Sequence, residues 1–460
     1  METVSGRLAG FITETGYDAI PEDVLEICRK AVLDVIGCIF GAIHEESCRI
    51  LEEFVLESEE GKGNSTIIGT SKTASMLGSI LVNASRADAL EYSDVNKAGG
   101  GHPGCMVVPT ALAVAETYGA SGKDLLTAVA LGYEAHRAAV PLYPQAFRDG
   151  IHLVMFGGTF GAMATAGKLM GLSQPQVKNA FGICAVVPVA PFEPCRVGGQ
   201  VKDLYTGWSA RTGVLACLLA KKGLTGTGTI LEGDLGLYRA LHASKGANSA
   251  LEGLGEDWIT RATCVKPHAS CRFTHSSADA ALGLALSHDF RVHDIEEIEI
   301  VTDTVPYQLN RGSTPITPID ARFSIPYVVA VALSKRRPVM LDDFSAEMLT
   351  DPVLNSLSKK VLVRLDKSLD ALYPEPPEGM GYRTCIMKIR FTNGRELQNR
   401  VDYPKGDPMN PVTFQEVTDK FKRILEPAFS GKKVEMLVEW VRNLEECPDC
   451  RPMIRQLGTS

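Results

Sequence analysis

The first half of the chain is a succession of segments in which apolar residues recur at helical spacing. Pro21 begins one such segment, and two acidic residues follow it in the first turn, where the helix dipole favours negative charge. Its apolar stripe consists of Val24, Ile27, Ala31, Val35 and Ile39. Residues 73–90 form a second segment, whose many Ala, Gly and Ser residues allow helices to approach closely. Further helices are predicted over 109–118 (which Pro109 begins), 123–140, 155–171, 175–186 and 207–222.

The pattern changes near residue 263. Residues 296–302 are typical of a strand, and Asn393-Gly394 between two strand-like runs is the strongest short hairpin signal. Residues 414–445 return to a helical pattern. We therefore expect a mainly α chain with an α+β part. A large all-helical domain is formed by both chain ends (1–264 and 405–460), and a smaller α+β lid domain (265–404) is inserted between them.

The charge balance excludes several classes of partner. The chain has 47 Lys and Arg against 55 Asp and Glu, a net charge of −8 over 460 residues. Such a chain has no overall attraction for nucleic acid or an anionic membrane, so an anionic ligand needs a local cluster of cations. We find no signal-peptide pattern and no apolar run of membrane-spanning length. Twelve scattered cysteines, including the pair Cys447 and Cys450, fit reduced thiols in a cytoplasmic protein.

A glycine-rich loop carries the first candidate functional residue. Gly99-Gly100-Gly101-His102-Pro103-Gly104 permits a backbone path that other residues resist, and it brings His102 near the start of a helix. Glu91 and Asp94 lie just upstream and are candidates to orient this histidine or to bind substrate. The alternative is a flexible connector in which the histidine has no role.

A second candidate site lies at 266–275, where cations are dense for an acidic chain. Ser276 and Asp279 are spaced like a capping box, which places His275 at a helix N-terminus. The helix dipole there disfavours the imidazolium form, which suits a neutral general base. A solvated basic loop is the alternative. The titratable and charged side chains of this stretch are Lys266, His268, Arg272 and His275.

Three residues are weaker candidates when taken alone. His152 precedes a segment with the glycine run 157–161, which we attribute to helix packing because the pattern of a phosphate loop is missing. Lys202 is either a carboxylate clamp or a surface lysine, and Tyr327 is either a proton donor or a buried structural tyrosine. The sequence has no nucleotide-binding, serine-hydrolase or zinc-protease motif. What remains is a site without cofactor or metal, suited to proton transfer next to a carboxylate.

These segments together resemble the MmgE/PrpD family, which includes 2-methylcitrate dehydratase, cis-aconitate decarboxylase and iminodisuccinate epimerase. The acidic stretch of that family falls on Glu91-Tyr92-Ser93-Asp94-Val95, where Glu replaces the first Asp, Ser the second and Val the Thr. The stretches that carry the resemblance keep the family order over nearly the whole chain: 101–104, 108–113, 158–162, 202 with 204–207, 230–233, 266–275, 323–327, and 405–408 with 410–411.

The resemblance implies a helical domain with a smaller α+β lid, a homodimer, and a site between the domains. It implies catalytic roles for His102, His152, Lys202, His275 and Tyr327. Arg272, Lys266, Glu91, Asp94 and His268 remain as candidate substrate-binding residues.

The function we expect is that of a cofactor-free lyase acting on a small di- or tricarboxylic acid. We rank dehydration of the 2-methylcitrate type first, epimerisation or isomerisation of an iminodisuccinate-like dicarboxylate second, and decarboxylation of the cis-aconitate type third. A non-catalytic helical binding or scaffold protein of the same fold is the alternative of another class.

Overall fold

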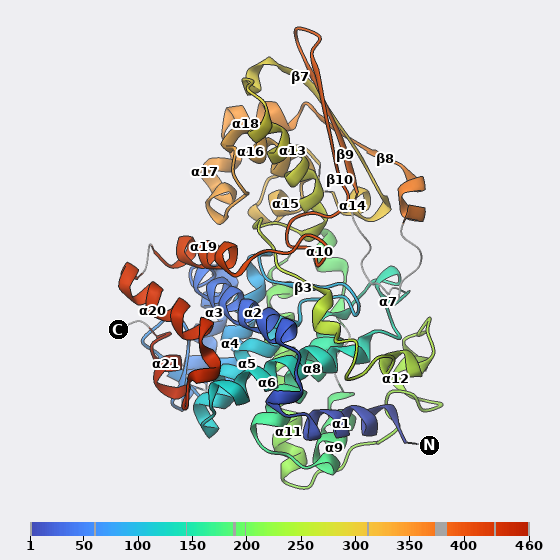
Figure 1. Cartoon of the computed structure of the whole chain (residues 1–460), viewed down its shortest axis with the longest axis vertical. Coiled ribbons are helices and arrows are strands. Elements are labelled where there is room, and N and C mark those ends of the chain that lie inside the picture. The colour runs from blue at the N-terminus through green and yellow to red at the C-terminus, as the bar shows by residue number, and fades with distance from the viewer. Residues whose placement is uncertain are drawn as a thin grey trace.

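A helical body and a smaller part built around a β-sheet make up the molecule (Figure 1). The computed structural model describes residues 2–58, 61–143, 145–186, 190–197, 199–310, 312–372, 384–426 and 429–458. The chain is mainly helical, and its longest strands all belong to one four-stranded sheet. The predicted fold class, mainly α with an α+β part, is therefore confirmed.

Both ends of the chain contribute to the helical body. In Figure 1 the C-terminal helices, in red, lie against the blue N-terminal ones. One apolar cluster joins buried residues between Val4 and Val265 to buried residues between Val412 and Leu457. The long helices of the body are α1 (Val4–Glu14), α2 (Glu22–Gly41), α3 (Glu46–Glu57), α4 (Met76–Ala89), α5 (Pro103–Tyr118), α6 (Gly122–Ala135), α8 (Leu153–Leu169), α9 (Gln174–Cys184), α11 (Leu204–Lys221), α19 (Phe414–Leu425) and α20 (Gly431–Arg442).

Small residues allow the central helices α5, α6 and α8 to pack closely. A Cβ on Gly158 of α8 would lie 2.1 Å from Met106 Cε of α5. A Cβ on Gly161 would lie 2.9 Å from the carbonyl oxygen of Gly132 in α6. The glycine run 157–161 thus serves helix packing, as predicted.

Several helix limits and one cap differ from the sequence prediction. Helix α5 begins at Pro103, and Pro109 lies inside it. The helix continues because nearly all of it is buried, and this packing outweighs the roughly 3 kcal/mol that an interior proline costs. The predicted helix over 414–445 is two helices, α19 and α20. The expected capping box at Ser276 is also wrong, because Asp279 bonds to His268 and to the Lys405 N–H instead.

The smaller part is a mixed sheet with helices packed against it. Strands β7 (Ile295–Thr302), β8 (Val361–Leu365), β9 (Cys385–Phe391) and β10 (Glu396–Val401) lie in the order β10-β9-β7-β8, and only the β7–β8 pair is parallel. Gly394, with φ +81°, lies in the turn of the β9–β10 hairpin, which confirms the Asn-Gly prediction. The main helices here are α13 (His275–Ser287), α16 (Ile325–Lys335) and α18 (Pro352–Ser358).

A second apolar cluster lies between this sheet and its helices. It draws most of its members from 269–391, and a few residues of the helical body, among them Leu90 and Tyr92, also belong to it. The two parts therefore share a packed interface. The domain limits predicted at 264 and 405 stay a prediction.

Candidate active site

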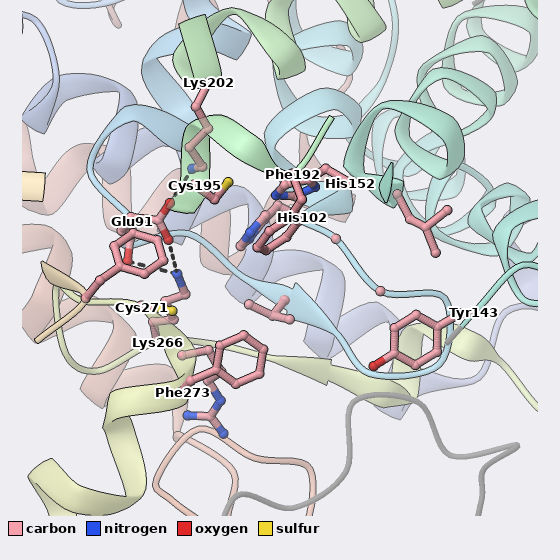
Figure 2. A pocket seen from close by; sticks show the side chains of 16 residues that line it. Glu91, His102, Tyr143, His152, Phe192, Cys195, Lys202, Lys266, Cys271 and Phe273 are labelled. Atoms are coloured by element: carbon pink, nitrogen blue, oxygen red, sulfur yellow. Dashed lines mark hydrogen bonds and ion pairs between the residues drawn. The ribbon is translucent and has the colours of Figure 1, made fainter. Parts of the chain in front are cut away.

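A pocket lies where the helical body meets the start of α13. Its volume is about 560 Å³, which includes the part of the pocket that is open to solvent. Figure 2 shows that a cluster of charged side chains lies at one end of it and Tyr143 at the other. The pocket is lined by Glu91, Val95, Gly100, Gly101, His102, Tyr143, His152, Leu153, Phe192, Cys195, Lys202, Lys266, Cys271, Arg272, Phe273 and Phe323.

The glycine-rich loop brings His102 to the pocket as the N-cap residue of α5. Gly101 has φ +82°, and a Cβ there would lie 2.9 Å from Val154 Cα. Only glycine allows the loop to pass this close to the first turn of α8. Behind the loop, His136 Nε2 hydrogen-bonds to the carbonyl oxygen of Gly100. The loop is therefore held from two sides.

The hydrogen bonds of His102 determine its tautomer. Its Nδ1 lies 2.7 Å from the carbonyl oxygen of Asp94, which can only accept, so Nδ1 carries the proton. Burial lowers the pKa of His102 below its ordinary value. The side chain is thus a neutral imidazole whose Nε2 has a free lone pair, which is the form that a general base requires.

His152 has the opposite tautomer. Its Nδ1 accepts the Val154 N–H at 3.3 Å, so Nε2 carries the proton of the neutral ring. Burial, with a smaller contribution from His102, lowers its pKa to about 3. The ring stacks on Phe192 with centroids 5.0 Å apart, and it lies 6.3 Å from the His102 ring. The pocket therefore holds a proton acceptor on one imidazole and a proton donor on the other.

A buried ion network forms the charged end of the pocket. Lys202 Nζ pairs with Asp88 Oδ2 at 3.0 Å and with one carboxylate oxygen of Glu91. Lys266 Nζ contacts the other carboxylate oxygen of Glu91 at 3.4 Å and the Glu91 carbonyl oxygen at 2.9 Å. The Lys202 ammonium has three donors and two of these partners, so one N–H remains for a ligand. Lys266 is fully buried and holds Glu91 in place.

The network keeps its members charged. Burial alone would raise the pKa of Glu91, but the Lys202 and Lys266 ammonium groups outweigh burial and hold that pKa far below its ordinary value. The pKa of Asp88 is lowered in the same way by Lys202. Burial would lower the pKa of Lys202, yet the two carboxylates raise it well above the ordinary value. Both carboxylates are thus anions and Lys202 is a cation at neutral pH.

Arg272 lines the pocket, whereas His275 lies behind it. Arg272 Nη1 donates to His275 Nδ1 at 3.2 Å and to the Lys405 carbonyl oxygen at 3.0 Å, and Nη2 lies 3.6 Å from Asp407 Oδ2. His275 begins α13, as predicted, and burial lowers its pKa well below the ordinary value. Its Nε2 lies 3.2 Å from the Ser270 carbonyl oxygen. With both nitrogens hydrogen-bonded, His275 holds Arg272 in place, and its role as a general base stays a prediction.

Three further predicted site residues lie outside the pocket lining. Tyr327 is fully buried in the second apolar cluster, and its hydroxyl donates to the Asp343 carbonyl oxygen at 2.6 Å. His268 bonds to Asp279 at 2.9 Å and accepts the Val339 N–H. Asp94 accepts the Tyr133 hydroxyl at 2.9 Å, and burial raises its pKa to about 7. Their side chains hold neighbouring elements in place.

Sequence reasoning missed the counter-ions and most of the apolar wall. Asp88 lies in the last turn of α4, whereas Glu91 follows the end of that helix with φ +53°, and the two carboxylates meet only at Lys202 in the folded chain. Asp407 pairs with Lys97 at 3.1 Å as well as with Arg272, and only the folded chain brings these residues together. The other missed pocket side chains are Val95, Tyr143, Leu153, Phe192, Cys195, Cys271, Phe273 and Phe323.

The described residues show three further features of the chain. No group of three or more of their His, Cys, Asp or Glu side chains is arranged to hold a metal ion. None of their helices combines the length and the apolar character needed to cross a membrane. All twelve cysteines are free thiols, and eleven of them are buried.

The chain is therefore a two-part helical protein, with a helical body and a smaller sheet-containing part. Its pocket, which contains two imidazoles and two lysines, lies between the two parts. Residues 6–250 match the MmgE/PrpD N-terminal domain, and residues 268–446 match the MmgE/PrpD C-terminal domain. The chain belongs to the MmgE/PrpD family, which confirms the resemblance seen in the sequence.

Two of the three relatives described here span nearly the whole chain, and all three have low identity to it. The cis-aconitate decarboxylase-like protein oryM of Aspergillus oryzae is 24% identical and covers 98% of this chain and 96% of its own length. The cis-aconitate decarboxylase of Aspergillus terreus is 24% identical and covers 99% and 96%. The alkylcitrate dehydratase phiI of Talaromyces stipitatus is 25% identical over 58% of this chain and 61% of its own length.

Proposed function

We propose that this chain is a lyase that eliminates water from a hydroxy carboxylic acid by removing the proton next to a carboxylate. The observation that carries the proposal is the complementary protonation of His102 and His152 on the wall of one pocket. The names of the relatives, a dehydratase and decarboxylases, support a lyase of carboxylic acids.

The proposed mechanism uses His102 twice. Its Nε2 takes the proton from the carbon next to the carboxylate, and negative charge develops on the carboxylate oxygens. Lys202 stabilises that charge with its remaining N–H. The resulting His102 imidazolium is destabilised by burial, so it readily gives the proton to the departing hydroxyl, which leaves as water. His152 donates a hydrogen bond from its Nε2–H to the same hydroxyl and keeps its proton, so both imidazoles end the cycle neutral.

Proton exchange and product formation in heavy water test this assignment. Wild-type protein, offered hydroxy di- and tricarboxylates, should form an alkene and exchange the α-proton for deuterium in NMR spectra. The variant His102→Gln should lose both signals, by about 10²–10⁴-fold for a positioned base. The variant His152→Phe, which keeps the stacked shape, should lose elimination by about 10²–10³-fold and retain exchange.

The control variant is Tyr327→Phe, because its hydroxyl lies outside the pocket. It should exchange and eliminate at the wild-type rate. Unimpaired turnover in His102→Gln would refute the proposal, and a fall in turnover of the folded control would place the Tyr327 hydroxyl at the substrate.

Decarboxylation is the second candidate, and the relatives favour it. Those that span almost the whole chain are named cis-aconitate decarboxylases or a decarboxylase-like protein. The same pocket would then stabilise the carbanion left by carbon dioxide, and an imidazole would protonate it. Release of carbon dioxide from cis-aconitate, without consumption of any hydroxy acid, would replace the first proposal by this one.

A further inference from the structure

Lys420 of α19 is a buried lysine that lies behind the pocket wall, outside the described residues that line the pocket. In Figure 1, α19 lies at the top of the helical body, on the side that faces the sheet-containing part. The Lys420 ammonium pairs with Asp34 Oδ1 of α2 at 2.7 Å, and a buried charge needs such a partner. This single carboxylate contact leaves further N–H groups of the ammonium that require other acceptors.

Two backbone carbonyl groups provide these acceptors. Lys420 Nζ donates to the carbonyl oxygen of Tyr92 at 2.6 Å and to that of Lys266 at 3.1 Å. The Nζ atom also lies 3.5 Å from the centroid of the Tyr92 ring, which is a cation–π contact. The Tyr92 hydroxyl in turn donates to the Pro267 carbonyl oxygen at 3.2 Å. The ammonium and the ring beneath it therefore cross-link two segments that are distant in the sequence.

The two cross-linked segments carry the charged end of the pocket. Glu91 directly precedes Tyr92, and its φ of +53° is a conformation that a residue with a side chain keeps only when its surroundings hold it. On the pocket side, Lys266 Nζ contacts the carboxylate and the carbonyl oxygen of Glu91. Lys420 thus holds from behind the same two segments that meet through Glu91 and Lys266 in the pocket.

We propose that Lys420 is a positioning residue, whose ammonium keeps the Glu91 carboxylate where it holds the Lys202 ammonium. The inference rests on the proposed function, in which the remaining N–H of Lys202 stabilises the developing charge. Without Lys420, the two carbonyls lose their shared donor, and Glu91 is free to leave its strained conformation. A displacement of about 1 Å near reacting groups costs on the order of 10²-fold in rate. We therefore expect kcat to depend on a lysine that lies outside the pocket.

A pair of variants separates this positioning role from the stability of the ion pair. Lys420→Met leaves Asp34 buried without its ion-pair partner, so both the urea midpoint and kcat should fall. Lys420→Met/Asp34→Asn removes that charge as well, so most of the loss in the urea midpoint should be recovered. Its kcat should stay about 10²-fold below that of the wild type, because methionine cannot donate to the two carbonyls. Recovery of kcat together with stability would show a purely structural lysine and overturn the inference.

The matched control is Lys168→Met. Lys168 also donates to two backbone carbonyl oxygens, those of Thr13 at 3.0 Å and Thr15 at 2.7 Å. It lies in the last turn of α8, about 24 Å along the helix from His152 at about 1.5 Å per residue. The control should lose stability and keep the wild-type kcat. An equal fall in kcat for Lys168→Met and Lys420→Met would overturn the inference, because turnover would then respond to any lost carbonyl contact.

A crystal structure of the folded double variant Lys420→Met/Asp34→Asn tests the inference without any substrate. The Tyr92 and Lys266 carbonyl oxygens should move apart, and the Glu91 carboxylate should lose its contact with Lys202 or Lys266. A site unchanged from the wild type would overturn the inference, whatever the kcat. A displaced Glu91, together with failure of the wild type to form an alkene from any hydroxy acid, would refute the proposed function alone.

Discussion

Removal of the Lys202 ammonium should destabilise the protein by leaving Asp88 as a buried carboxylate without a partner. The two groups lie 3.0 Å apart, and the side chains are 6% and 0% exposed. At an effective dielectric constant of about 20, unit charges at that distance attract by about 5 kcal/mol. Breaking a buried pair from one side costs about 3–5 kcal/mol. We therefore expect Lys202→Met to lower the free energy of unfolding by about 3–5 kcal/mol at pH 7.

The double variant Lys202→Met/Asp88→Asn shows whether the orphaned charge causes that loss. It removes the carboxylate together with its partner, so most of the lost stability should return, while Lys266 still pairs with Glu91. Urea unfolding of the wild type, both single variants and the double variant gives the coupling free energy. Turnover should be absent from every variant that lacks Lys202, because its N–H stabilises the developing charge.

The pH dependence of the free energy of unfolding shows whether the charge on Asp88 causes the loss of stability. In the wild type the pKa of Asp88 is low, so the stability from the ion pair is present above the unfolded pKa and is lost only in strong acid. In Lys202→Met, burial raises the pKa of Asp88, so protonation relieves the orphaned charge as the pH falls. The stability gap to the wild type should therefore narrow from pH 7 to pH 5. A single variant as stable as the wild type, or a double variant no more stable than the single one, would refute the reasoning.

Three further outcomes are expected. Asp94, with a pKa of about 7 against an ordinary value of about 3.9, binds a proton more tightly when folded, so stability should fall by up to about 1.4 kcal/mol per pH unit between about pH 4 and pH 7. Asp94→Asn should abolish that slope in thermal or urea unfolding. In Gly101→Ala the added Cβ would lie 2.9 Å from Val154 Cα on a backbone with φ +82°. We expect a strong drop in kcat together with a loss of roughly 1–3 kcal/mol in the free energy of unfolding, and an unchanged kcat would contradict the loop geometry. Tyr327→Phe removes the donor to the Asp343 carbonyl and should cost about 1–2 kcal/mol with kcat unchanged, whereas a fall in kcat would place its hydroxyl at the substrate.

The fold was largely predictable because it depends on local periodicity. The sequence pattern located most of the long helices, although not α1 and α3, and Asn393-Gly394 located the hairpin. The start of α5 was mispredicted because either Pro103 or Pro109 could occupy the first turn of the helix. Proline is preferred in the first turn, and only the burial of the whole helix shows that Pro103 holds that position while Pro109 is tolerated inside.

The site was predictable where one residue type stands in an unusual local context. His102 follows three glycines, and Lys266 and Arg272 stand in a dense basic stretch, so these lining residues were found. Which of two nearby residues faces the pocket depends on tertiary contacts. Arg272 and His275 are three residues apart, and their hydrogen bonds to each other and to the chain at Lys405 decide that the arginine lines the pocket.

The helical core and the chemistry of the pocket are connected through helix ends. His102 and His152 are the N-cap residues of α5 and α8, the helices whose close packing the small residues permit. A helix N-terminus disfavours a protonated imidazole and attracts an anion. Burial acts in the same direction on both rings. The packing that brings the two helix ends to one pocket thus also keeps its imidazoles neutral and favours an anion beside them.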